Sequence, residues 1–432
     1  MALRRFPQCR RDVTIGLGKT VMSLAEVQRR METHDLMKVL VVTTKTAFSV
    51  WMDHAALMLP DLPAFALDSK SKSWTPPSSQ QYFVVTNWDA LRSLDILSII
   101  GWTYVIADEA HYAKNRKAQR TKRLKYLHTV YKRALTGTPI INRPDELWSI
   151  LNWLYPSHFR SYWKFYNRYV EFERNPYHGY DNIIGPKNVE ELRQQIKAFT
   201  IRRLKRNVLT ELPDKYYETI TVELSPQQRR VYEEMRKRSL AWVGENEDQA
   251  VPAKLAVSKL IRLRQFCTAY AEISEEDKVI LSEPSSKLDA VMDIIEGTDQ
   301  PVVVFTQFRG VVKLLEARLM AAHISYVVVH GGIKDNDRAA AIATFAESKA
   351  RVFLCTVQTG GVGITLTASN LAIFVDRSWS PATNLQAEDR LHRFGQRSAV
   401  QVVLIQANNT VDQVVEDKLT WKWNMIRKIL GG

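Results

Sequence analysis

Short runs of apolar, mostly β-branched residues recur along the chain, and each run ends in small or acidic residues. The runs begin at Val39, Thr103, Val302, Val352 and Ala372. Uninterrupted apolar runs of this length are typical of strands covered on both faces, as in a parallel sheet flanked by helices. Helical stretches alternate with the runs, which fall into two clusters at residues 1–140 and 287–410. The pattern therefore predicts an α/β protein with two parallel-sheet lobes.

The region between the two clusters differs in composition, with many aromatic residues and longer helical patterns. Aromatic residues at helical spacing more often form a core than a stacking platform, so we expect helical packing here. A further helix is predicted from the N-cap Ser225 to about Trp242, with Gln228 at the capping-box position. We expect a first lobe over residues 1–155, a mainly helical insertion over 156–286 and a second lobe over 287–432. The aromatic residues are Trp148, Trp153, Tyr155, Phe159, Tyr162, Trp163, Phe165, Tyr166 and Tyr169.

Size and charge narrow the class of protein. A chain of 432 residues is longer than one hydrophobic core usually serves. The formal charge of +14 favours a polyanionic partner, nucleic acid ahead of a membrane surface, although a merely soluble basic protein fits the charge alone. Cys9, Cys267 and Cys355 are too few and too scattered for a zinc site or a disulfide framework, which indicates a reducing, intracellular compartment. No stretch approaches the roughly 20 apolar residues of a membrane span.

Two separated motifs together describe a site that hydrolyses a nucleoside triphosphate. The first is GLGKT, at Gly16, Leu17, Gly18, Lys19 and Thr20. Its glycines let backbone amides approach a phosphate, its lysine supplies a charge for the β- and γ-phosphates, and its threonine hydroxyl can ligate magnesium. Val13 stands where the full phosphate-loop pattern has its first glycine, so this motif alone is a moderate signal.

The second motif, DEAH at Asp108 to His111, follows a predicted strand. Both carboxylates therefore fall at the carboxyl end of a strand, where ligands bind in open α/β sheets. We expect Asp108 to hold the metal and Glu109 to orient and deprotonate the attacking water.

Two further blocks complete the constellation. LTGTP spans Leu135 to Pro139, and QAEDRLHRFGQ spans Gln386 to Gln396. If the second block is helical, Gln386, Arg390 and Arg393 share one face. Two arginines on one face usually form a solvated surface, but opposite a phosphate their planar forks suit the charge of γ-phosphoryl transfer.

The order and spacing of GLGKT, VIADEAHYAKN, LTGTPIINRPDELWSILNWLYP, LPDKY, TGGVGITLTASN and QAEDRLHRFGQ resemble the Swi/Snf-type ATPases of helicase superfamily 2. The resemblance extends from about Gly16 to about Lys422. It implies two RecA-like lobes with ATP and Mg²⁺ between them and duplex DNA lying across both. ATP hydrolysis would then alternate the distance between two DNA-gripping surfaces, which makes the protein a motor.

Carried over by position, the resemblance implies roles for individual residues. Arg393 is the expected arginine finger, assisted by Arg390, and Gln386 helps to order the γ-phosphate or the water. Gly361 and Gly363 let the backbone approach nucleotide or DNA. Thr136 and Thr138 couple hydrolysis to strand contact.

A basic segment after DEAH is the main candidate for binding DNA. It has nine basic residues and no acidic one, although such a run is often only a solvated face. We expect sequence-independent contacts to DNA phosphates, with Lys45 and Thr138 contributing from neighbouring blocks. The nine residues are Lys114, Arg116, Lys117, Arg120, Lys122, Arg123, Lys125, Lys132 and Arg133.

The chain also departs from the family pattern. Relatives carry a glutamine-containing segment that reads adenine and an acidic pair ahead of the phosphate loop. Here Gln8 is the sole upstream glutamine, and Val13 and Thr14 replace the acidic pair. We expect a shortened or divergent start and a compact motor without added chromatin-reading modules.

Three functions stay open on the sequence. The first is a monomeric, ATP-driven translocase on duplex or branched DNA, in a bacterial or virus-infected cytoplasm or a eukaryotic nucleus. The second is a strand-separating helicase, for which no wedge is recognisable. The third is a DNA-binding scaffold without turnover, against which the intact Glu109 and Arg393 argue.

Overall fold

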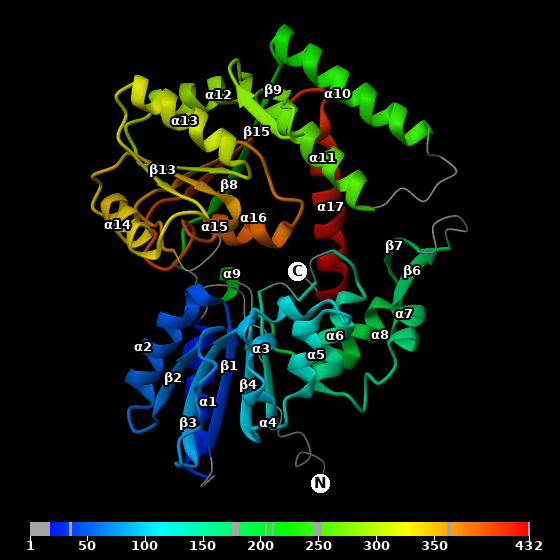
Figure 1. Cartoon of the computed structure of the whole chain (residues 1–432), viewed down its shortest axis with the longest axis vertical. Coiled ribbons are helices and arrows are strands. Elements are labelled where there is room, and N and C mark those ends of the chain that lie inside the picture. Colours follow the sequence, from blue (N-terminus) through cyan, green and yellow to red (C-terminus); the bar gives the residue numbers. More distant parts are fainter. Residues whose placement is uncertain are drawn as a thin grey trace. The chain divides into compact units, whose positions relative to one another are not determined.

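The computed structural model describes residues 18–33, 37–137, 139–140, 142–174, 181–203, 205–209, 211–245, 253–360 and 364–430 (Figure 1). The chain divides into two compact units. One is formed by Met1–Glu173, Asn182–Thr210 and Lys422–Gly432, and the other by Arg174–Asp181 and Glu211–Trp421. Segment 156–286, expected as an insertion, is thus shared by the two units. Among the residues described, none of the helices combines the length and apolar character that crossing a bilayer demands.

The first unit is built on a five-stranded parallel sheet in the order β2-β3-β1-β4-β5. Its central strand carries Val41 opposite Val85 on one side and Ile106 on the other. The apolar runs from Val39 and Thr103 lie in β1 and β4, as predicted. The strands are β1 (Met37–Thr43), β2 (Ala64–Leu67), β3 (Gln81–Asn87), β4 (Trp102–Asp108) and β5 (Thr129–Leu135).

Helices cover both faces of this sheet. Buried Leu24, Trp51 and Leu59 pack α1 (Lys19–Met31) and α2 (Phe48–Met58) on one face. Trp102 and Trp153 belong to the core of the other face. The second face is covered by α3 (Ala90–Ser93), α4 (Ile96–Ile99), α5 (Gln119–Tyr126) and α6 (Glu146–Leu154). Two short 3₁₀ helices, η1 (Lys45–Ala47) and η2 (Ala110–Ala113), follow β1 and β4.

The aromatic region forms a small core beside the sheet. Phe165, Tyr166 and Tyr169 are buried, which confirms the prediction of helical packing, whereas Trp163 is largely exposed. An antiparallel hairpin follows the helix that begins at Tyr162. The elements are α7 (Tyr162–Tyr169), β6 (Val170–Glu173), β7 (Asn182–Pro186), α8 (Val189–Lys197) and α9 (Lys205–Val208).

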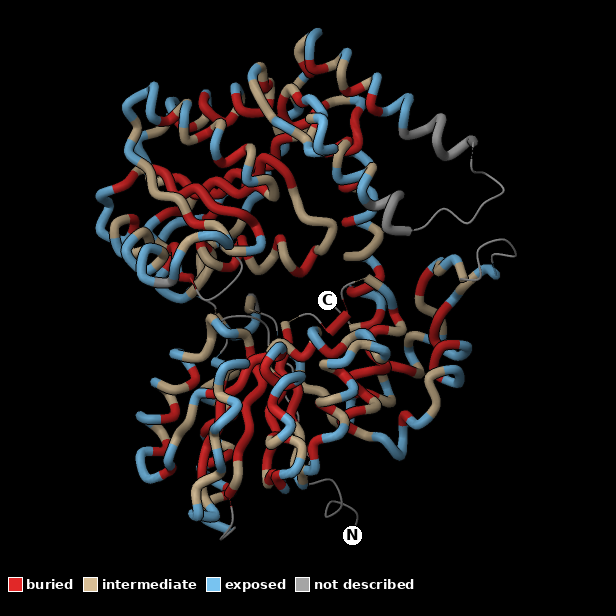
Figure 2. The backbone as a smooth tube through the Cα atoms, in the orientation of Figure 1, coloured by how far each residue is buried: buried red, intermediate tan, exposed pale blue. Residues whose placement is uncertain are grey.

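The second unit holds a six-stranded parallel sheet in the order β12-β13-β11-β14-β15-β8. The runs from Val302, Val352 and Ala372 lie in β11, β13 and β14, as predicted, and Figure 2 shows the central strands as buried. The edge strand β8 comes earliest in the chain and pairs with β15, where Lys215 is opposite Val400. The strands are β8 (Lys215–Val222), β11 (Val302–Thr306), β12 (Tyr326–Val329), β13 (Val352–Thr356), β14 (Leu371–Phe374) and β15 (Val400–Ala407).

Two helical layers enclose this sheet as well. Helices α12 (Ser286–Glu296) and α13 (Arg309–Ala321) pack on one face, and α14 (Asp335–Ala346), α15 (Val357–Gly360) and α16 (Pro381–Glu388) on the other. The predicted cap at Ser225 is present, because its Oγ accepts the Gln228 amide hydrogen at 3.3 Å. The remaining elements are α10 (Pro226–Glu245), α11 (Ala253–Thr268), the hairpin β9 (Tyr270–Ile273) and β10 (Val279–Ser282), and α17 (Val411–Leu430).

A buried polar cluster of Arg264, Thr306 and Asp376 fixes α11 to the second sheet. Asp376 follows β14, and its carboxylate accepts the Thr306 hydroxyl at 2.6 Å and the Gln307 amide at 3.0 Å. Arg264 of α11 lies 3.4 Å from the same carboxylate and also donates to the Arg377 carbonyl. Because a buried charge is stable only when it is paired, these contacts lock the helix to the strand ends.

Candidate functional site

The phosphate-loop helix α1 begins at Lys19, directly after Gly18. Gly18 caps α1 in the left-handed region, at φ 71° and ψ 32°, a conformation that glycine adopts without penalty. No side chain caps the helix there, and a Cβ atom at Gly18 would meet nothing within 4 Å. The start of an α-helix, where backbone N–H groups lack partners within the helix, is a favourable place for a phosphate. Gly16 and Leu17 lie outside the described residues.

Lys19 brings a charge to this helix start. Its Nζ is buried, lies 3.8 Å from Glu109 Oε1 and has no hydrogen-bond partner within the described part of the chain. A buried ammonium without hydrogen bonds is unfavourable unless a ligand completes its shell. The geometry therefore fits a triphosphate whose β- and γ-oxygens would accept from Lys19. Thr20 follows in the same turn.

Asp108 is the last residue of β4, at the carboxyl edge where the sequence predicted it. Its Oδ2 accepts the Thr43 hydroxyl at 2.8 Å and the Trp51 indole N–H at 3.0 Å. Burial raises the pKa of Asp108 and the neighbouring Glu109 charge adds to the effect, while Lys19 opposes it.

A hydroxyl from Thr20 and a carboxylate from Asp108 are the hard oxygen donors that Mg²⁺ prefers. No cluster of three or more acidic, histidine or cysteine side chains occurs among residues whose positions are described. Magnesium bound here would take few protein ligands and complete its shell with phosphate and water.

Glu109 has an unusual backbone conformation. It adopts φ 48° and ψ 50°, the left-handed region that costs a non-glycine residue roughly 1 kcal/mol or more. Its side chain lies between two cations or potential cations, because Oε1 faces Lys19 and Oε2 lies 3.2 Å from His111 Nδ1. The turn thus directs the carboxylate back to the phosphate-loop lysine.

The predicted DNA-binding residues have varied surroundings. Lys45 in η1 and Lys117 after η2 are exposed. Lys114 pairs with Glu146 at 3.1 Å, and the Arg116 guanidinium lies 4.0 Å from the centre of the Tyr162 ring. Thr138 lies outside the described residues. Lys45, Lys117 and Lys122 are thus exposed cations of this set.

For Arg133 the prediction of DNA contact is wrong, whereas for the half-buried Lys132 it stays a prediction. Successive side chains of β5 alternate between the two faces of the sheet. Arg133, which is 1% exposed, therefore points to α1 and donates to the Met22 carbonyl. Lys132 points the other way and donates to the Trp153 carbonyl at the end of α6. Both cations serve packing within the first unit.

The arginines of the second unit leave the expected helix. α16 ends at Glu388, so Arg390 and Arg393 lie in turns and do not share a helical face with Gln386. The chain bends here because Leu391 is buried in the core and Gln396 donates to the Ser369 carbonyl at 2.8 Å.

After this bend, both arginines contact the same loop. Arg390 Nη1 lies 3.4 Å from the Ile364 carbonyl, and Arg393 Nη1 donates to the Thr365 hydroxyl at 3.1 Å. Gly361 and Gly363, which precede that loop, are not among the described residues. The arginines therefore meet the TGGVGIT block within their own unit.

Two groups of residues near the candidate site were not predicted from the sequence. The His111 and Tyr112 rings stack on each other shortly after Glu109 in the chain. Their place in the sequence DEAHY could have indicated that they lie near the candidate site. Glu388, which is buried, accepts from Lys215 Nζ at 2.6 Å and from the Tyr217 hydroxyl at 2.7 Å. The LPDKY block carries no local signal for this contact, because its partner Glu388 lies far along the chain.

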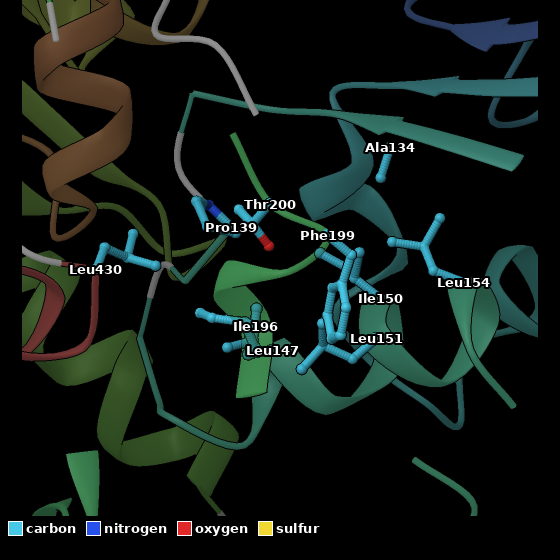
Figure 3. Close-up of a pocket in the computed structure, with 10 residues that line it drawn as sticks. All are labelled: Ala134, Pro139, Leu147, Ile150, Leu151, Leu154, Ile196, Phe199, Thr200 and Leu430. Carbon is cyan, nitrogen blue, oxygen red and sulfur yellow. The ribbon is translucent and has the colours of Figure 1, made fainter. Parts of the chain in front are cut away.

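A small apolar cavity of about 20 Å³ lies elsewhere in the first unit (Figure 3). It has room for little more than one water molecule, and its lining is almost wholly apolar, with the Thr200 hydroxyl as the exception, so it is too small for a nucleotide. Its lining residues are Ala134, Pro139, Leu147, Ile150, Leu151, Leu154, Ile196, Phe199, Thr200 and Leu430.

Comparison with known proteins matches an SNF2-related domain over residues 14–271 and a helicase conserved C-terminal domain over residues 286–395. The chain is 25% identical to the transcription regulatory protein SNF2 of Saccharomyces cerevisiae, covering 96% of this chain and 26% of that protein. It is 29% identical to the uncharacterized ATP-dependent helicase MG018 of Mycoplasma genitalium, covering 96% of this chain and 40% of that protein.

A solved Sulfolobus solfataricus SWI2/SNF2 ATPase core in complex with dsDNA is 26% identical, with a TM-score of 0.45, and the match covers 98% of this chain and 88% of that one. The chain spans well under half the length of the two curated relatives. With one family model covering more than half of its residues, the chain belongs to the SNF2-related family of helicase-like proteins.

Proposed function

We propose that this chain is an ATP-driven motor that moves along duplex DNA without reading its sequence. The observation that carries the proposal is the convergence of Lys19, Asp108 and Glu109 at the carboxyl edge of the first sheet. They come from separate elements, yet they supply a phosphate cation, a metal ligand and a carboxylate for water. These are the groups that cleavage of a triphosphate needs.

The chain's own residues divide the chemistry between them. The amides at the start of α1 and the Lys19 ammonium would bind the phosphates, and Glu109 would orient the attacking water and take its proton. Magnesium held by Thr20 and Asp108 would neutralise phosphate charge. Arg390 and Arg393 are proposed to stabilise the charge that develops on the γ-phosphate.

The DNA part of the proposal is supported by the basic chain and its family. Lys45 and Lys117 are exposed; Lys45 follows β1, and Lys117 follows β4, the strand that ends at Asp108. Contacts of this kind go to DNA phosphates, so affinity should fall steeply with salt and depend little on sequence.

The test is ATP turnover measured with duplex, single-stranded and forked DNA and with RNA. We expect strong stimulation by duplex DNA, loss of turnover in Lys19→Ala, and a fall in kcat of about 10²-fold to 10⁴-fold in Glu109→Gln with retained binding of ATP and DNA. Lys278→Ala and Glu276→Gln, at an exposed pair, are matched controls.

DNA-independent turnover, or undiminished hydrolysis by Glu109→Gln, would contradict the proposal. Displacement of a triplex-forming strand but not of a duplex strand would favour translocation over strand separation.

A further inference from the structure

Three stacked aromatic rings lie next to Glu109, and the chemistry proposed above gives none of them a role. The Tyr112 ring stacks on His111, with centroids 4.8 Å apart and planes at 29°. It also stacks on Trp88, with centroids 6.0 Å apart and planes at 18°. Trp88 follows β3, whereas His111 and Tyr112 lie in η2, so the aromatic stack of these three residues joins two strand ends.

One end of the aromatic stack touches the catalytic carboxylate. His111 Nδ1 lies 3.2 Å from Glu109 Oε2, but the two atoms are not aligned for a hydrogen bond. Because Glu109 is the N-cap of η2, any movement of this turn also moves the Glu109 backbone.

The other end is tied to the metal-binding strand and to β1. The Trp88 indole N–H donates to the Asp108 carbonyl at 3.1 Å, and the Trp88 amide donates to the Thr43 carbonyl at 3.2 Å. Thr43 in turn donates its hydroxyl to Asp108. Trp88 is 3% exposed, so its ring braces these strand ends and cannot itself lie on DNA.

Both segments proposed to grip DNA begin at this stack. Lys45 follows Thr43 by two positions, and Lys117 follows Tyr112 by five. Arg120 also lies over the Tyr112 ring, at 5.6 Å. A phosphate that displaces the Lys117 segment would act on the Tyr112 ring directly, and one that displaces the Lys45 segment would act on it through Trp88.

We propose that Tyr112 is a positioning residue that transmits DNA contact to the Glu109 carboxylate through His111. This inference rests on the proposed function. Rigid rings in contact pass on displacements that flexible side chains would absorb, and a misplacement of about 1 Å in a catalytic group can cost about 10²-fold in rate. Among the described residues, Tyr112 makes its hydrogen bond to the Glu109 carbonyl and its ring contacts to His111 and Trp88, not to Lys19 or Asp108, so the effect falls on kcat and not on the KM for ATP.

The experiment compares wild type, Tyr112→Leu and Tyr112→Phe, with Tyr126→Leu as the control at an exposed tyrosine in the neighbouring helix. For each we measure ATP turnover with and without duplex DNA, the KM for ATP, the affinity for a fluorescent duplex and the melting temperature. In Tyr112→Leu the ratio of stimulated to basal turnover is expected to fall about tenfold, while the KM and the DNA affinity stay within about twofold of wild type. Tyr112→Phe keeps the ring and should keep the ratio, as should Tyr126→Leu.

A wild-type ratio in folded Tyr112→Leu would overturn the inference, and so would a loss of the ratio that comes with a matching loss of DNA affinity. Equal loss in Tyr112→Phe would also overturn it, because the ring would then not be the transmitting group. If the wild type itself shows no stimulation by DNA, the proposed function fails and not this inference alone.

Discussion

The buried polar cluster of the second unit offers a sharp test of how that unit is held together. Asp376→Asn keeps the size of the side chain but removes its charge. Arg264, which is 2% exposed, would then keep the Arg377 carbonyl as a partner but lose its counter-ion. The substitution therefore leaves a buried guanidinium without a compensating charge.

The expected cost follows from the contacts. Breaking a buried ion pair by removing one partner costs about 3–5 kcal/mol. The asparagine oxygen can still accept the Thr306 hydroxyl or the Gln307 amide, so we expect the low end, about 3 kcal/mol. Since 1.4 kcal/mol is a factor of ten, the open state of the second sheet should become about 100-fold more populated.

Amide hydrogen exchange followed by mass spectrometry resolves the two units in one experiment. Peptides from β11 and β14 should exchange about 100-fold faster in Asp376→Asn, whereas peptides from β1 and β4 serve as the internal reference in the first unit. Asp299→Asn, at an exposed position of the second unit, is the control. Adding Arg264→Met to Asp376→Asn removes the orphaned charge and should restore part of the protection.

Exchange in β11 and β14 that changes less than about threefold would show that the pair contributes little, as surface pairs do. A change of the same size in both units would also refute the reasoning, because the contacts lie in one unit only.

Two other predictions test charges elsewhere. Burial lowers the pKa of Lys125 to about 8, below its value of about 10.4 in an unfolded chain. Between these two pH values the unfolded state holds the proton and the folded state does not. The free energy of unfolding should therefore rise as pH increases through this range. Lys125→Met should flatten that rise in urea unfolding, whereas Lys122→Met should not, and an unchanged slope would rule out the effect. Arg393→Ala should lower the DNA-stimulated kcat by about 10³-fold with ATP binding retained, against an unaffected Arg397→Ala, and a loss under tenfold would remove Arg393 from its proposed role.

The strands of both sheets, and the approach of Lys19 to Glu109, were predictable because their signals are local. A strand buried on both faces must be continuously apolar, so the runs from Val39 and Val302 indicated β1 and β11 without any knowledge of their neighbours. GLGKT and DEAH likewise carry their chemistry in consecutive residues, and the structure brings Lys19 and Glu109 within 3.8 Å.

What could not be predicted depends on distant partners. Helical spacing predicted that Gln386, Arg390 and Arg393 share one face. It could not show that Leu391 is buried or that the helix ends at Glu388. A count of basic residues cannot show that Arg133 faces α1, because that depends on which face of β5 the helix covers.

The position of β8 has a consequence for how the protein is made. This strand leaves the ribosome long before β15, the strand that it pairs with in the described sheet, because β15 begins only at Val400. Until then its backbone groups have no strand to pair with, and pairings between such distant segments form slowly. Translation that stalls before residue 400 should therefore yield a nascent chain whose second half is open to proteases and chaperones, while the earlier sheet, whose strands are complete by Leu135, can already have folded.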